Sequence, residues 1–196
     1  MKVLKWGIRG NDRLEKAEGK VWKVEYLAHI NEKGAEQSLK EHLTNTAILA
    51  GKFANSFGAY EWGYCCGLLH DIGKYSLKFQ ERLHGKEEKV DHSTAGAKLC
   101  WEQKGAYPFL SYCIAGHHAG LPDTGDISDT STEGTMMGRL KKRLEDYQRF
   151  TEEIEIPELK NLPFQPVKGE NLMLYPQWFE EKREMLWTLS GIYCLQ

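Results

Sequence analysis

Six side chains along the chain have the types and the spacing of a metal site. They are His42, His70, Asp71, His92, His117 and His118. A buried imidazole or carboxylate is costly unless it is hydrogen-bonded, paired with a charge or bound to a metal. One histidine on an apolar helix face is more often a core residue. Five of them on inward faces or helix ends, with one adjacent aspartate, instead favour a metal cluster.

The ligand types narrow the metal. A set of imidazoles with one carboxylate suits Mn, Fe, Co, Ni or Zn, leaves Mg possible and is poor for Ca. Because five imidazoles share one carboxylate, Asp71 is predicted to bridge two divalent ions. Two such ions, roughly 3.5–4 Å apart, lower the pKa of a shared water and clamp a phosphoryl oxygen. The pattern therefore predicts phosphate-ester hydrolysis with one or two divalent transition metal ions as cofactors and no protein nucleophile.

Helices are predicted to position these ligands. "SLKE" (38–41) is a capping-box pattern, and apolar residues recur behind it at helical spacing. This pattern predicts a helix over 39–57 with His42 on its apolar face. The stretch "VWKVEYLAHI" (21–30) fits a short strand or the lead-in to that helix. Further helices are expected at about 60–72, 75–84, 91–103 and 108–120.

The second half of the chain is predicted to be less regular. Residues 119–135 are rich in Gly, Asp, Ser and Thr, which indicates a long flexible surface loop after the fifth helix. A basic amphipathic helix is expected over 136–150. Residues 151–175 contain three prolines and are expected to be irregular, and Pro176 fits the first turn of a last helix.

The overall fold class is therefore predicted to be all-α. Residues 1–20 are polar and lysine-rich, and we interpret them as a leader or an added segment outside a single domain of residues 21–196. No run of roughly 18 apolar residues is found, so no membrane span is expected. The net charge of −2 gives no global attraction to nucleic acid.

Two further features predict a cytoplasmic location. The N-terminal stretch has no apolar core of a signal peptide. The five cysteines are an odd number in apolar surroundings, which is typical of reduced, buried thiols.

The order of these motifs resembles that of the HD superfamily of metal-dependent phosphohydrolases. The three stretches "HDIGKYSLKFQ", "DHSTAGA" and "GHHAGLPD" together resemble the HD nuclease domain of the type I CRISPR nuclease-helicase. The resemblance covers about residues 24–195. It implies a helical HD bundle, a DNA endonuclease or exonuclease that prefers single strands, and two transition metals. It also implies two partners, namely a helicase domain or subunit and an RNA-guided surveillance complex.

The resemblance also assigns residues. His42, His70 and Asp71 would hold one metal, while Asp71, His92, His117 and His118 would hold the other. Asp71 and Lys74 are the implied catalytic residues, with Lys74 near the scissile phosphate. The family closes the first metal site with a further aspartate on the final core helix. The chain has no carboxylate after Glu184 that fits, so this site is expected to be weak or empty, in a domain lacking its extreme C-terminal part.

No GxxxxGK[ST] phosphate loop is present, so the helicase part is not expected in this chain. Lys74, Ser76, Arg139 and Lys142 are candidate DNA contacts. The basic run 138–149 fits either a solvated helix face or a contact to the DNA backbone. His29 matches no ligand position and is interpreted as structural or exposed. The alternatives to a DNA nuclease are an HD phosphohydrolase acting on nucleotides and an inactive HD module that docks onto a partner.

Overall fold

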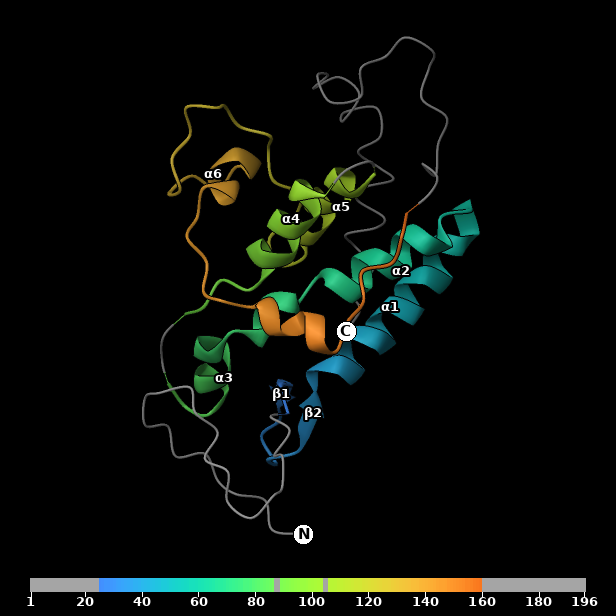
Figure 1. The fold of residues 1–196 in the computed structure, drawn as a ribbon, viewed down its shortest axis with the longest axis vertical. Helices are drawn as coiled ribbons and strands as arrows, with labels where there is room; N and C mark the ends of the chain where they lie inside the picture. Colours follow the sequence, from blue (N-terminus) through green and yellow to red (C-terminus); the bar gives the residue numbers. More distant parts are fainter. Residues whose placement is uncertain (1–24, 87–88, 104–105, 160–196) are drawn as a thin grey trace.

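The structure, a computed structural model, describes residues 25–86, 89–103 and 106–159. This part of the chain is mostly helical, with one small two-stranded antiparallel hairpin (Figure 1). The elements are β1 (Leu27–Ile30), β2 (Glu36–Ser38), α1 (Leu39–Ala54), η1 (Asn55–Phe57), α2 (Tyr60–Leu69), η2 (Ile72–Tyr75), α3 (Leu77–Leu83), α4 (Ser93–Glu102), α5 (Tyr107–Gly116), α6 (Met136–Leu140) and η3 (Gln148–Glu152). The all-α prediction is confirmed, and the stretch before α1 takes the strand alternative.

Helix α1 begins where the capping pattern predicts. The Ser38 hydroxyl accepts a hydrogen bond from the Glu41 amide at 3.2 Å, which satisfies one of the free amides of the first turn. Leu39 and Leu43 are fully buried on the face that also carries His42. The predicted apolar face is therefore the inner face of α1, and it directs His42 into the molecule.

Helices α1 and α2 lie side by side and approach closely (Figure 1). A Cβ at Gly67 of α2 would lie only 2.7 Å from the Ala47 Cα of α1. Only glycine fits such a contact, so the small residues in "WGYCCG" set the spacing of the two helices. This close packing brings the C-terminal end of α2 next to His42.

Helices α4 and α5 form a second pair, which completes the core (Figure 1). Leu69, Ile72, Leu110 and Ile114 are fully buried between the two pairs. The four described cysteines are buried thiols outside any disulfide, as the sequence predicts.

One predicted helix is wrong. The expected basic helix over 136–150 is limited to Met136–Leu140, and residues 142–147 are not helical. The aromatic rings of Tyr147, at the end of this segment, and of Phe150, just after it, are buried. A helix advances only about 1.5 Å per residue against roughly 3.3 Å for an extended chain. The extended segment therefore lets the chain cross the molecule and place both rings in the core.

The long loop that follows α5 is confirmed, and hydrogen bonds within it hold its irregular backbone. The Asp129 carboxylate accepts from the Thr135 hydroxyl at 2.5 Å and from the Asp126 amide at 3.1 Å. The loop's flexibility stays a prediction. Residues 153–159 have no helix or strand, as expected. The predicted last helix and the leader lie outside the described residues. Within the described ranges, no helix is long and apolar enough to cross a membrane.

Candidate metal centre

Most of the predicted ligands lie where helices begin or end. The helix expected over 60–72 stops at Leu69, so His70 and Asp71 occupy the turn between α2 and η2. His92 immediately precedes α4. His117 and His118 follow α5. Because these helix ends lie close together, they bring side chains from distant parts of the sequence to one site. Of the six predicted ligands, only His42 comes from within a helix.

The Asp71 carboxylate lies at the centre of the cluster. Its Oδ2 is 3.2 Å from Nε2 of His42 and 3.2 Å from Nε2 of His70. Its Oδ1 is 3.4 Å from Nε2 of both His92 and His117. The two oxygens therefore face two different groups of imidazoles, which is the arrangement of a bridging carboxylate.

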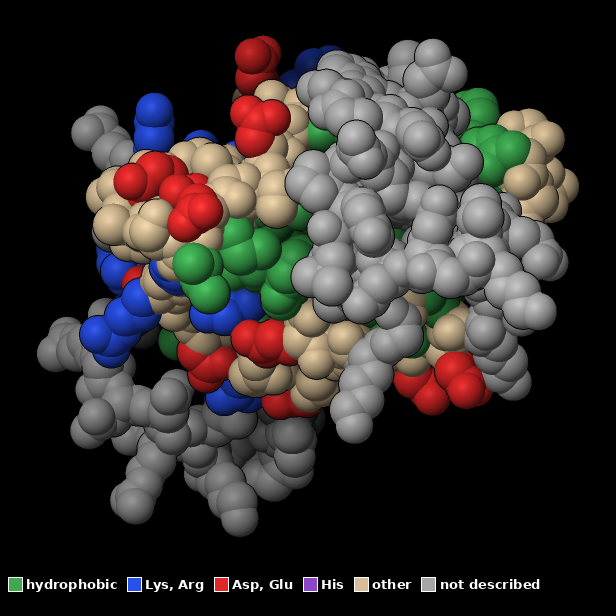
Figure 2. Space-filling view, turned by 90° about the horizontal axis from the view of Figure 1, so that it is seen from above, with side chains coloured by type: hydrophobic (Ala, Val, Ile, Leu, Met, Phe, Trp, Pro, Cys, Tyr) green, Lys and Arg blue, Asp and Glu red, His purple; other side chains and the backbone are tan. Residues whose placement is uncertain are grey.

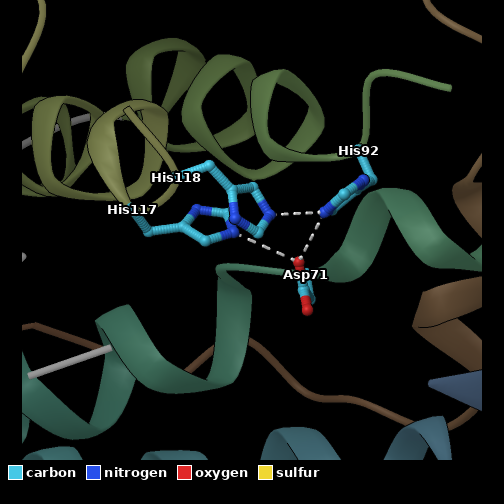
Figure 3. Close-up of side chains that lie close together, drawn as sticks. All are labelled: Asp71, His92, His117 and His118. Atoms are coloured by element: carbon cyan, nitrogen blue, oxygen red, sulfur yellow. Dashed lines mark hydrogen bonds and ion pairs between the residues drawn. The ribbon is translucent and has the colours of Figure 1, made fainter. Parts of the chain in front are cut away.

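Two ligand sets share this carboxylate. One is formed by His42, His70 and Asp71, and the other by Asp71, His92, His117 and His118; within each set the ligand atoms lie within 4.8 Å of one another. Figure 3 shows the second set, with His92 reaching across to His118 and to Asp71. The structure thus brings together all six predicted ligands. The prediction that the first set binds metal more weakly stays a prediction.

Backbone carbonyls orient the imidazoles. Nδ1 of His70 lies 2.7 Å from the Gly67 carbonyl oxygen, and Nδ1 of His117 lies 2.7 Å from that of Ile114. A carbonyl oxygen only accepts, so each Nδ1 donates its hydrogen and each Nε2 keeps its lone pair for a metal. Both carbonyls belong to last helical turns, where carbonyls lack an intrahelical donor.

The donor atoms fit a divalent transition metal. Nε2 of His92 and Nε2 of His118 are 2.8 Å apart, and their lone pairs repel unless a proton or a cation lies between them. The buried Oδ1 of Asp71 has its nearest ring nitrogens at 3.4 Å, too far for a good hydrogen bond. A cation among these atoms removes both unfavourable features. The imidazole-rich set suits Mn, Fe, Co, Ni or Zn.

Burial keeps three imidazoles of the cluster neutral. It lowers the pKa of His92 to about 4, although Asp71 opposes the shift. Burial also lowers the pKa of His70 and of His118. Burial by itself would raise the pKa of Asp71, but the surrounding imidazoles, His70 first, hold it well below its usual range. At neutral pH the cluster therefore presents the Asp71 carboxylate and, at His70, His92 and His118, neutral imidazoles, which are the forms that bind metal.

These shifts predict the pH dependence of stability for the metal-free protein. A histidine whose pKa falls on folding binds more protons when unfolded, so it stabilises the fold above pH 6.5 and this contribution is lost toward its folded pKa. For His92 the window is about pH 6.5 to 4. We expect the urea midpoint of EDTA-treated protein to fall between pH 7 and pH 5. In His92→Gln the fall should be smaller, and an equal fall in both proteins would contradict the prediction.

Lys74 lies inside the cluster. Its side chain is buried, and Nζ is 2.8 Å from Asp71 Oδ2. The same ammonium group lies 3.4 Å from the Ala28 carbonyl oxygen and 3.4 Å from His29 Nε2. Lys74 thus places a positive charge beside the His42 set.

His29 is a site residue that sequence reasoning missed. Its ring lies edge-on to that of His42, with centroids 5.0 Å apart, and close to Lys74. The sequence separates His29 from every ligand motif, and only the pairing of β1 with β2 brings it to the cluster. No local signal in "YLAHI" marks His29, because a register irregularity between Leu27 and His29 breaks the alternation of β1.

The other candidate DNA contacts lie outside the metal cluster. Ser76 is buried, and among the described residues no hydrogen bond or ion pair joins it to the ligands. Arg139 donates from Nε to the Gly134 carbonyl in the loop. Lys142 pairs with Asp91 at 2.8 Å, and Asp91 also accepts from the Thr94 amide at 3.0 Å. Asp91, whose pKa is about 2, therefore holds the start of α4 beside His92.

Comparison with known families gives one match. The model of the HD domain matches residues 39–156, which is more than half of the chain. The matched range contains all six ligands. No curated protein matches the chain.

Proposed function

Because the chain belongs to the HD domain family, we propose that it is a metal-dependent nuclease that hydrolyses phosphodiester bonds of single-stranded DNA. HD domains are metal-dependent phosphohydrolases, and the cluster fits a metal site. One observation carries the proposal: the Asp71 carboxylate lies between two imidazole groups, with each oxygen 3.2–3.4 Å from two Nε2 atoms. A shared carboxylate of this kind can hold the paired metals used in phosphodiester hydrolysis.

The residues have distinct parts in the reaction. A divalent ion held by either set supplies Lewis acidity and activates water. The imidazoles and Asp71 would fix the position of that ion. Lys74 stands beside Asp71 and adds a positive charge, which stabilises the negative charge that develops on the phosphate. His118 is the exposed member of the cluster, so the phosphate is expected to enter from its side.

The choice of DNA rests on the three quoted motifs and on the charge distribution. The motifs resemble those of the type I CRISPR nuclease. Figure 2 shows acidic and basic side chains interspersed on one face, with no single broad basic field. The net charge is −2, so phosphate attraction must come from local positive charge, to which the metal centre and Lys74 would contribute. A flexible single strand can bend into such a recessed site.

The same motifs support the proposed biological setting. We place the protein in a type I CRISPR antiviral system in the cytoplasm, where it acts with a helicase and an RNA-guided surveillance complex. In that setting the helicase supplies the single strand that this domain cuts. Coimmunoprecipitation with both partners tests this part independently of the chemistry.

Degradation of circular single-stranded DNA tests the proposed activity. With added manganese, the wild type should convert circles to linear and shorter products, and EDTA should stop the reaction. Linear products from closed circles would show endonucleolytic cutting. Hydrolysis of free nucleotides with intact circles would contradict the DNA proposal and favour a nucleotide phosphohydrolase. No hydrolysis of either substrate, at full metal occupancy, would favour an inactive docking module.

A further inference from the structure

A polar pocket adjoins the metal centre on the His42 side. Its volume is about 350 Å³, and it is lined by His29, Gln37, His42, Asn45 and Thr46. Ligand pockets in proteins are typically about 300–1,000 Å³, so this one can hold a group of nucleoside size. Because His42 belongs both to the pocket and to a ligand set, whatever occupies the pocket lies next to the metal centre.

Regular structure builds the pocket. His29 of β1 and Gln37 of β2 are directly paired in the hairpin, so their side chains lie on the same face of it. His42, Asn45 and Thr46 lie three and four positions apart on α1 and share one face of that helix. The pocket is therefore the space between the hairpin face and the second turn of α1, and rigid elements form both walls.

The lining favours a neutral ring joined to an anion. None of the five lining residues is a carboxylate, and Lys74 Nζ lies 3.4 Å from His29 at the border of the pocket. The amides of Gln37 and Asn45 can each donate and accept hydrogen bonds, as base edges require. The His29 imidazole offers a flat ring for stacking. A substrate whose phosphate lies beside Lys74 and whose nucleoside extends into the pocket matches this lining.

We propose that this pocket binds the nucleoside that flanks the scissile phosphodiester, with Gln37 and Asn45 hydrogen-bonding the base. This inference rests on the proposed nuclease function and goes beyond it by assigning substrate-binding residues outside the ligand motifs. It also gives a reason for single-strand preference. In a duplex the Watson–Crick edge of each base is covered by its partner, whereas in a single strand the two amides can reach it.

Chromogenic esters with one leaving group test the pocket directly. Thymidine 5′- and 3′-(p-nitrophenyl phosphate) carry a nucleoside, while methyl p-nitrophenyl phosphate carries none. With manganese, the wild type should hydrolyse either the 5′ or the 3′ ester of thymidine with a kcat/KM about tenfold higher than that for the methyl ester. The preferred ester shows on which side of the phosphate the nucleoside is bound. Gln37→Ala and Asn45→Ala should each reduce that ratio about threefold, mainly through KM. Gln148→Ala, which removes an exposed amide from η3, should keep the wild-type ratio.

Binding without cutting gives a second measurement. In EDTA, both pocket variants should bind fluorescein-labelled oligothymidylate about threefold more weakly than Gln148→Ala does, by anisotropy. Asn45→Asp, which adds a carboxylate beside the phosphate, should bind more weakly still.

The outcomes separate this inference from the function on which it rests. A wild type that hydrolyses the nucleoside and methyl esters equally would overturn the pocket assignment and leave the nuclease proposal standing. If Gln37→Ala and Asn45→Ala keep both the wild-type ester ratio and the wild-type affinity, the pocket assignment is likewise overturned and the nuclease proposal stands. A wild type that hydrolyses neither the esters nor DNA would overturn the nuclease proposal and this inference with it.

Discussion

Asp71→Asn should abolish DNA cutting, with a loss of about a thousandfold or more, because both ligand sets lose their shared carboxylate. The change keeps the shape of the side chain but removes the charge that faces four imidazole nitrogens. It also leaves Lys74 without the carboxylate that it contacts at 2.8 Å. The rate of circular DNA cleavage and the metal content, measured by mass spectrometry of metal-loaded protein, check this result together.

Asp146→Asn is the matched control. This aspartate is exposed, and its Oδ1 accepts a hydrogen bond from the Gln148 amide, which an asparagine oxygen can also accept. The two variants therefore remove the same charge from two different places. Asp146→Asn should retain wild-type cutting and metal content. Full activity of Asp71→Asn at saturating manganese would contradict the assignment of Asp71 as the bridging ligand.

Gly73→Ala should disable the second ligand set although it replaces none of the four ligand residues. A Cβ at Gly73 would lie 2.3 Å from the His92 carbonyl oxygen and 2.7 Å from its Cα. These are backbone atoms, so the start of α4 must move and carry the His92 ring away from Asp71. Loss of ligand support typically lowers metal affinity about 10–100-fold. Metal titration and DNA cutting should both show a loss of that size.

Gly134→Ala provides the comparison for this substitution. A Cβ there meets nothing within 4 Å, and its backbone has no positive φ that would disfavour alanine. This variant should behave as the wild type in both assays. If Gly73→Ala also binds metal and cuts DNA normally, then the position of His92 does not depend on its contact with η2.

Local chemistry in the sequence determined much of this protein. Ser38 caps α1 because its hydroxyl is placed to accept from the third helical amide, and the apolar repeat behind it then directs His42 inward. The six candidate ligands also follow from the sequence, since a buried group of imidazoles with one carboxylate is costly unless its members are hydrogen-bonded, paired with a charge or bound to a metal. These inferences depend on residue type and near neighbours, and the cluster and the HD match agree with them.

Long-range packing decided the features of the fold and of the site that local sequence patterns did not predict. The burial of Lys74 depends on contacts with a segment far along the chain, because its Nζ lies 3.4 Å from the Ala28 carbonyl oxygen and 3.4 Å from His29 Nε2. Lys74 and Asp71 are close in sequence, but His29 reaches them only because β1 pairs with β2 beside α1. The basic run after Met136 has good helical periodicity, yet the burial of Tyr147 and Phe150 requires an extended chain there. Periodicity describes one segment at a time, whereas burial of these rings and charges depends on the whole core.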